Sequence, residues 1–90
     1  MYQVNYFLKL PHLNSMSGVK NQEVSRKLGV RVRYLRERKG LSTREFADTA
    51  GISFSQVWSI ESGAGNPTIG TLDAIAKVFN LSLAELLKDI

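Results

Sequence analysis

Residues 42–63 read STREFADTAGISFSQVWSIESG, and the fold of the chain is decided here. Ser42 followed three residues later by Glu45 is the pattern of a capping box, in which both side chains satisfy backbone N–H groups at the start of a helix. Gly51 ends that helix, because glycine adopts the positive φ of a tight turn at little cost. Ser53 then starts a second helix. The stretch therefore predicts two short helices joined by a sharp turn.

The apolar residues of this stretch predict how the two helices pack. Two short helices cross at a steep angle only where the first offers a small side chain, and Ala47, beside the inward-facing Phe46, provides one. Val57 and Ile60 would hold the second helix against the core, because residues three apart share one helix face. With the turn at Gly51, this spacing is typical of a helix-turn-helix, whose second helix enters the major groove of DNA.

The residues on either side of this stretch predict further helices. Residues 22–39 carry apolar side chains at helical spacing, and Gly40 follows them. Thr68 and Ser82 are natural caps at the start of two later helices. The inward-facing positions expected in these three helices are Val24, Leu28, Val32, Leu35, Ile69, Leu72, Ile75, Ala76, Phe79, Leu83, Leu86, Leu87 and Ile90. The chain is therefore expected to be all-α, a compact bundle of five helices.

Residues 1–22 differ from the rest of the chain. Apolar residues recur at every second position from Tyr2 to Leu10, which is the periodicity of a β-strand, and residues 11–18 have the composition of a linker. A lone strand has no partner in a helical chain, so it either pairs with its copy in a second subunit or lies irregularly on the helical body. We expect an N-terminal arm over residues 1–22 and one helix-turn-helix domain over residues 23–90, with its motif at residues 43–62.

The composition excludes several classes of protein. With 90 residues and no cysteine, the chain has room for one small domain and has neither disulfides nor a thiol metal site. His12 is the single histidine and lies in the expected linker, so we expect no metal, no cofactor and no catalytic activity. No apolar run approaches the roughly 18 residues of a membrane span, and the N-terminus lacks the pattern of a signal peptide, so a cytoplasmic protein is expected.

The charge is distributed unevenly along the chain. The net charge is +4, but residues 1–44 contain ten Lys or Arg and two Glu, whereas residues 45–90 contain two Lys and six acidic residues. Such asymmetry is expected of a protein that binds a polyanion through one part of its surface. It is equally compatible with an ordinary solvated basic helix.

Four segments carry a family likeness: LGVRVRYLRERKGLS, TREFADTAGIS, IESGAGNPTIGTL and IAKVFNLSLAELL. Through them the chain resembles the Cro/C1-type (XRE-like) helix-turn-helix family from Leu28 to Leu87, with residues 1–22 outside the likeness. The resemblance implies a lambda-repressor-like five-helix fold in a small bacterial or phage transcriptional regulator. It also implies a homodimer that binds near-palindromic operators in double-stranded DNA, in the cytoplasm and on the nucleoid when bound.

The same resemblance assigns DNA contacts by position. Thr43 falls where the family commonly has a glutamine beside a DNA phosphate, and Arg44 adjoins it. Positions on the second helix fall where the family reads base edges, and the following loop meets the DNA backbone. The expected DNA-binding residues are Thr43, Arg44, Ser53, Phe54, Ser55, Gln56, Ser59 and Asn66. For the serines and the asparagine, the alternative is ordinary capping and turn chemistry.

Two further contacts follow from the resemblance. Arg36 is expected to form a partly buried ion pair with Glu61, which would tie the first helix to the end of the reading helix. A dimer contact is expected at the C-terminal end, at Leu83, Leu86, Leu87 and Ile90. We expect the homodimer to form through this end, through the N-terminal arm, or through both.

The chain departs from the family on its reading helix. Residues 45–76 contain no basic side chain, so the cations that bind phosphates are expected to come from elsewhere, such as Lys20, Arg26 and Arg31. Trp58 is expected to point outward, where it would pack on the DNA backbone, anchor a protein or lie beneath the N-terminal arm. The alternative function is therefore a protein–protein interaction module, antitoxin-like or regulatory, that binds DNA weakly.

Overall fold

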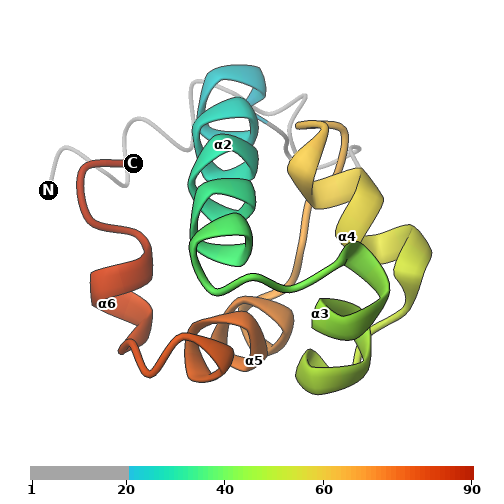
Figure 1. Ribbon diagram of the computed structural model, residues 1–90. Coiled ribbons are helices and arrows are strands. Elements are labelled where there is room, and N and C mark those ends of the chain that lie inside the picture. The colour runs from blue at the N-terminus through green and yellow to red at the C-terminus, as the bar shows by residue number, and fades with distance from the viewer. Residues whose placement is uncertain (1–20) are drawn as a thin grey trace, which may run out of the picture.

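A computed structural model describes residues 21–90, and all regular structure in this part of the chain is helical (Figure 1). The helices are α2 (Gln22–Arg38), α3 (Thr43–Ala50), α4 (Phe54–Glu61), α5 (Ile69–Val78) and α6 (Leu83–Leu86). The prediction of an all-α bundle of five helices is thus confirmed for these residues. The strand and linker expected before them lie outside the described residues. None of the described helices is long and apolar enough to span a bilayer.

Side-chain caps determine where the helices begin. Three helices start with a reciprocal capping box, formed by Ser42 with Glu45, Ser53 with Gln56, and Ser82 with Glu85. In the box of α3, the Glu45 N–H donates to Ser42 Oγ at 3.0 Å, and the Ser42 N–H donates to Glu45 Oε1 at 2.8 Å. The capping box predicted at this position is confirmed, and each box satisfies two N–H groups that have no partner within their helix.

The capping boxes of α3 and α6 should make stability depend on pH. Hydrogen bonds from the serine backbone N–H hold the pKa of Glu45 and that of Glu85 below the ordinary value of 4.5. A carboxyl group whose pKa is lowered in the folded chain stabilises the fold above its ordinary pKa, and this contribution is lost as the pH falls through the lowered value. We therefore expect the stability of the domain to fall with acidification through this window.

A variant without these two carboxyl groups tests the expectation. Glu45→Gln/Glu85→Gln keeps an acceptor at both positions, as Gln56 does naturally in α4, but the amide does not titrate. Urea unfolding at about pH 6 and about pH 3 should show a larger loss of stability in the wild type than in the variant. Equal losses in the two proteins would mean that other groups account for the acid sensitivity.

The core is built from one face of each helix. Its buried apolar side chains are Leu28, Val32, Phe46, Ala47, Val57, Ile60, Ile75, Ala76 and Leu86. Phe46 stacks on Phe79 with 5.4 Å between the ring centroids. All of these residues were expected to face inward from helical spacing, and these expectations are confirmed.

Two other apolar positions were expected in the core and are exposed instead. The exposed fraction is 44% for Val24 and 71% for Ile69. Both residues lie in the first turn of their helices. Helical spacing gives the face on which a side chain lies, but it does not show whether another helix covers that turn. The last helix is also shorter than expected, since α6 ends at Leu86.

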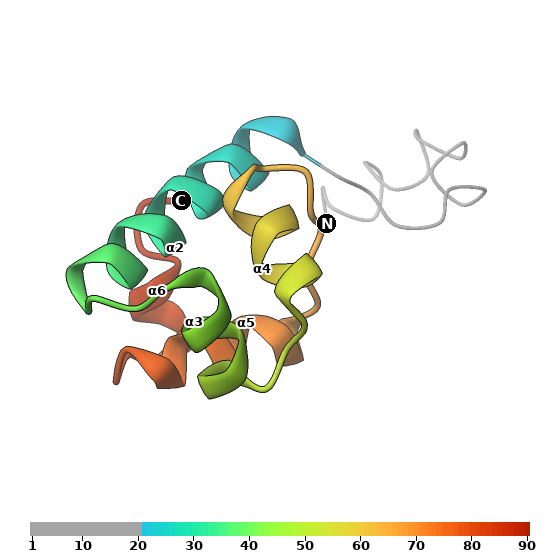
Figure 2. The same ribbon diagram turned by 45° about the vertical axis from the view of Figure 1, so that its right-hand side comes forward.

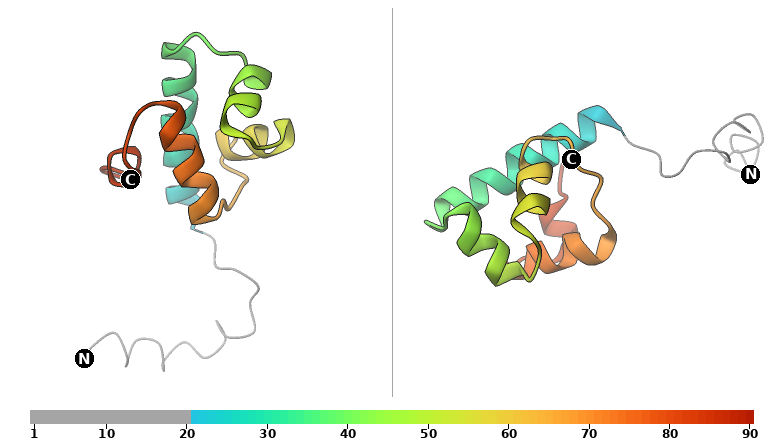
Figure 3. Two further views of the ribbon diagram at one scale, coloured as in Figure 1. Left: turned by 90° about the horizontal axis from the view of Figure 1, so that it is seen from below. Right: turned by 90° about the vertical axis from the view of Figure 1, so that its right-hand side faces the viewer.

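The packing around α2 places the helix-turn-helix. α4 packs against α2, α3 packs against α4 and α5, and α5 packs against α6. Figures 1 and 3 show α3 and α4 on one side of α2, with α6 and the C-terminal end on the other. The pair α3–α4 is therefore presented at a surface that the C-terminal segment does not cover.

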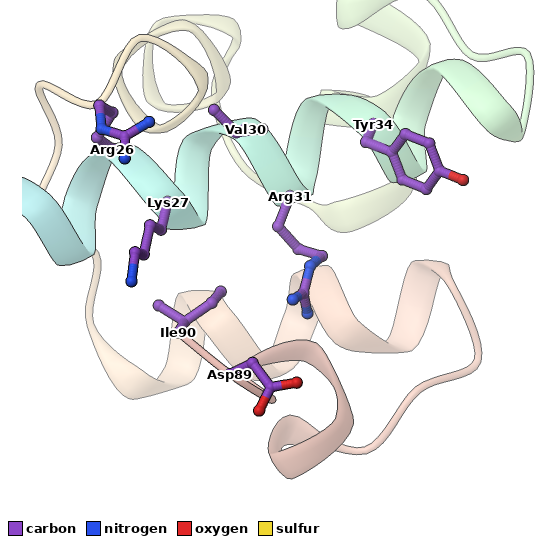
Figure 4. A pocket seen from close by; sticks show the side chains of 7 residues that line it. All are labelled: Arg26, Lys27, Val30, Arg31, Tyr34, Asp89 and Ile90. Carbon is purple, nitrogen blue, oxygen red and sulfur yellow. The ribbon is translucent and has the colours of Figure 1, made fainter.

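Arg31 fixes the C-terminal segment to α2. Its Nη1 donates to the Leu86 carbonyl at 2.9 Å, and its Nη2 donates to the Lys88 carbonyl at 2.8 Å. Figure 4 shows the guanidinium directed from α2 toward this segment. Arg31, expected to supply a cation to DNA, therefore has a structural role here: its donors satisfy the carbonyls of Leu86, the last residue of α6, and of Lys88 beyond it.

Candidate nucleic-acid interface

α3 and α4 meet in the geometry that a helix-turn-helix requires. α3 ends at Gly51, whose φ is 73°, and the Ile52 N–H donates to the Ala47 carbonyl at 3.0 Å. Ala47 is 2% exposed and Val57 is fully buried, so the small side chain lies at the crossing and the apolar one anchors α4. Figure 2 shows the two helices following one another around the turn.

The outward face of α4 is mainly aromatic. Phe54 is 45% exposed and Trp58 is 62% exposed, and residues four apart on a helix lie side by side. Ser55 is also exposed. Ser59, expected to face outward with them, is half-buried beneath the following loop, and its Oγ lies 3.0 Å from where a Cβ on Gly65 would be.

The polar side chains that border α4 are engaged within the chain. Ser53 Oγ accepts from the Gln56 N–H, and Gln56 Oε1 accepts from the Ser53 N–H, both at 3.0 Å. Ser62 Oγ donates to the Ser59 carbonyl at 3.0 Å. Ser53 thus has the capping role that was the alternative considered for the serines, and Gln56 has a capping role that was not expected. Asn66 is exposed in the loop that follows.

Arg44 connects the first turns of α3 and α4. Its guanidinium carbon lies 5.1 Å from the centroid of the Phe54 ring, within the range of a cation–π contact. The structure thereby brings together two residues that the sequence analysis assigned separately. The contact places a positive charge beside the first residue of α4, a helix that itself contains no basic side chain.

The expected partners Arg36 and Glu61 lie in a bidentate ion pair. Arg36 Nε donates to Glu61 Oε2 at 2.7 Å and Arg36 Nη2 donates to Glu61 Oε1 at 3.0 Å, while Nη1 donates to the Leu41 carbonyl at 2.9 Å. The side chains are 12% and 11% exposed. The hydrogen bonds with Glu61 raise the pKa of Arg36 above its ordinary value. The pair joins the last turn of α2 to the last residue of α4.

A hollow of about 250 Å³ lies between α2, α3 and α4, next to this ion pair. Its lining consists of Arg33, Arg36, Thr43, Trp58, Glu61 and Ser62. Arg33 was not among the expected cations, although it is three residues before Arg36 and therefore shares its helix face. The hollow places a largely exposed guanidinium within reach of the start of α3, where phosphate contacts are expected.

The C-terminal residues divide between the core and the surface. Leu86 is fully buried within its own chain, so its expected role in a dimer contact is wrong. Leu87 and Ile90 pack against the core while remaining partly exposed, and Leu83 is half-buried. Of the four residues expected in a dimer contact, only these three partly exposed side chains are accessible to a second copy.

Comparison of the sequence with known proteins identifies the helix-turn-helix family. The profile of the helix-turn-helix family matches residues 32–86. Over 61 residues the chain is 36% identical to the HTH-type transcriptional regulator PuuR of Escherichia coli (strain K12), an alignment that covers 68% of this chain and 33% of PuuR. The chain thus aligns with about a third of the length of that relative.

Solved structures give the same result for the fold. The restriction-modification controller protein C.AhdI from Aeromonas hydrophila is 32% identical with a TM-score of 0.66, covering 69% of this chain and 94% of that one. SinR, the master regulator for biofilm formation, in complex with DNA is 35% identical with a TM-score of 0.64, covering 68% of this chain and 98% of that one.

Proposed function

Because the chain belongs to the Cro/C1-type helix-turn-helix family of transcriptional regulators, we propose that it binds double-stranded DNA sequence-specifically and regulates transcription. It acts by binding, without catalysis. The observation that carries the proposal is the placement of α4: Val57 anchors its inner face while Phe54 and Trp58 stay exposed on its outer face. A helix held in this way is suited to enter a major groove. We assign residues 23–90 to the DNA-binding domain and residues 1–22 to an N-terminal arm.

The start of α3 is the proposed phosphate contact. The first N–H groups of a helix and the positive end of its dipole attract anions, and Thr43 and Arg44 are the first two residues of α3. Arg33, across the hollow from Thr43, adds a second cation on the same side of α4. These two arginines compensate for the absence of basic residues on α4 itself, because phosphate neutralisation supplies most non-specific affinity.

We further propose that the protein binds as a homodimer to a near-palindromic operator, with the second copy at the face opposite α4. A groove of about 300 Å³ runs between α2 and the C-terminal segment there (Figure 4). Its lining is mixed: Val30 and Tyr34, which are 58% and 54% exposed, and the partly exposed Ile90 are interspersed with the charged Arg26, Lys27, Arg31 and Asp89. Exposed apolar side chains bordered by charged ones are common at subunit contacts. On the nucleoid, such a dimer would place two α4 helices in successive major grooves.

Selection from a pool of random duplexes at two salt concentrations tests this function. The full chain should enrich an inverted repeat, and its affinity should fall steeply with salt because bound phosphates release counterions. Arg44→Ala should weaken binding and reduce the salt slope by about one. Lys77→Ala is the matched control, since this exposed lysine lies on α5 and pairs with Asp73 at 2.8 Å.

The opposite outcome would favour the interaction module. If no sequence is enriched and the affinity stays near the non-specific level of roughly 10⁻⁴–10⁻⁶ M, the chain is not an operator-binding regulator. The exposed pair Phe54 and Trp58 would then be the surface to test for a protein partner, because exposed aromatic residues are common anchors of protein contacts.

A further inference from the structure

The reading helix offers few polar groups to the edges of bases. Gln56 could pair with adenine only through both atoms of its amide, but Gln56 Oε1 already accepts from the Ser53 N–H and from Ser53 Oγ. Ser62 Oγ donates to a backbone carbonyl, and Ser59 lies beneath the loop. Arginine and lysine, the usual partners of guanine, are absent from α4. Hydrogen-bonded readout by α4 is therefore restricted mainly to Ser55.

The start of α4 instead presents a held aromatic ring. Phe54 is the first residue of the helix and is 45% exposed. The guanidinium of Arg44 lies over its ring at 5.1 Å, and this cation–π contact favours the observed orientation of the ring. A side chain that is ordered before binding loses less conformational entropy when it makes a contact. The same arginine lies in the first turn of α3, on the side proposed to approach a phosphate.

Given the proposed function, we propose that Phe54 recognises the 5-methyl group of a thymine in the major groove. Thymine is the base that presents an apolar group there, whereas cytosine presents an amino donor at the neighbouring position. The amino group of cytosine placed against the Phe54 ring would exchange hydrogen bonds to water for a weak N–H···π contact, which is a net loss. The contact therefore specifies thymine by attraction to the methyl group and by rejection of cytosine.

Arg44 gives this contact its position along the DNA. Its charge neutralises a phosphate while its guanidinium stays in contact with the Phe54 ring. The base that Phe54 contacts therefore lies at a fixed distance along the DNA from the phosphate bound at the start of α3. Trp58, one turn further along α4, lies in the hollow with Arg33 and Thr43 and is not required for this readout. The proposed specificity is thus a property of the Arg44–Phe54 pair.

Substitution of uracil for thymine tests the proposal, because uracil lacks only the methyl group. In the operator obtained by selection, each thymine of one half-site is replaced singly by uracil. We expect one position at which the full chain binds the uracil duplex roughly 4- to 10-fold more weakly, as follows from burial of a single methyl group. At that position a C·G pair should bind weakly, and 5-methylcytosine in place of cytosine should restore part of the affinity.

Variants assign the effect to the side chain. Phe54→Ala should bind the thymine and uracil duplexes equally, and because Phe54 lies outside the core this change should leave folding intact. Ile69→Ala, which removes an exposed apolar side chain from α5, should keep the full discrimination. Equal affinity of the wild type for both duplexes at every position, or discrimination that survives in Phe54→Ala, would overturn the methyl contact alone. Failure to select any operator would overturn the proposed function and the methyl contact together.

Discussion

Replacing Glu61 by leucine is expected to destabilise the domain by about 3 to 5 kcal/mol, because it leaves the Arg36 guanidinium charged in a nearly buried position. The two side chains are only 12% and 11% exposed, and two hydrogen bonds join them. For a small domain whose total stability is of the order of 5 kcal/mol, this loss approaches complete unfolding. Urea unfolding monitored by circular dichroism measures it.

The double variant Arg36→Met/Glu61→Leu distinguishes the effect of an unpaired charge on stability from the effect of altered packing at the site. With both charges removed, no unpaired charge is buried, so most of the stability should return. The control is Glu37→Ala, which removes the partner of Arg33 in a pair whose side chains are 64% and 56% exposed. Such a pair contributes about 0 to 1 kcal/mol, and the control should stay within that range. A double variant as unstable as Glu61→Leu would argue against an unpaired charge as the cause.

Gly29→Ala is expected to destabilise the domain by about 3 kcal/mol. A Cβ on Gly29 would collide with the Ile60 carbonyl oxygen and would lie 2.8 Å from the Glu61 carbonyl oxygen. These atoms belong to the backbone of α4, so α2 and α4 must move apart to admit the methyl group. Helix propensity alone would favour alanine by about 1 kcal/mol, so the sign of the change distinguishes the packing effect from propensity.

Gly70→Ala is the matched control for this substitution. Gly70 also lies in a helix, but the nearest atom to an added Cβ is Thr68 Oγ1 at 3.8 Å, an ordinary contact. This variant should be as stable as the wild type or more stable by up to about 1 kcal/mol. In Gly29→Ala, DNA affinity should fall as well, because the end of α4 is displaced. Equal stability of the two variants would contradict a close approach of α2 to α4.

The helix starts and the helix-turn-helix spacing were predictable because they depend on neighbours along the chain. Ser42 and Glu45 are three residues apart, and their capping box involves only the first turn of its own helix. The turn at Gly51 is local as well, because glycine adopts the positive φ that the turn requires at little cost. The burial of Val57 followed from its position relative to that turn.

The candidate site was predictable by position but not in its contacts. Family likeness placed Phe54 and Gln56 together on the reading helix, and both lie at its start. It did not show that Gln56 closes a capping box or that Arg44 lies over Phe54, because each contact depends on which of several rotamers the neighbouring side chains favour. Ser59 was expected to face outward because helical periodicity describes only α4 itself. It does not show that the loop containing Gly65 covers this side chain.

The sequence by itself determined where the helices begin, which face of each is apolar and which positions belong to the reading helix, since these follow from interactions within a few residues. Tertiary structure alone decided the roles of Gly29 and Arg31. Gly29 is needed because the backbone of α4 passes against it, and Arg31 is bound to carbonyl groups 55 and 57 residues further along the chain. The physical reason is that periodicity fixes the orientation of a side chain on its helix, whereas packing the whole core fixes which helix it meets.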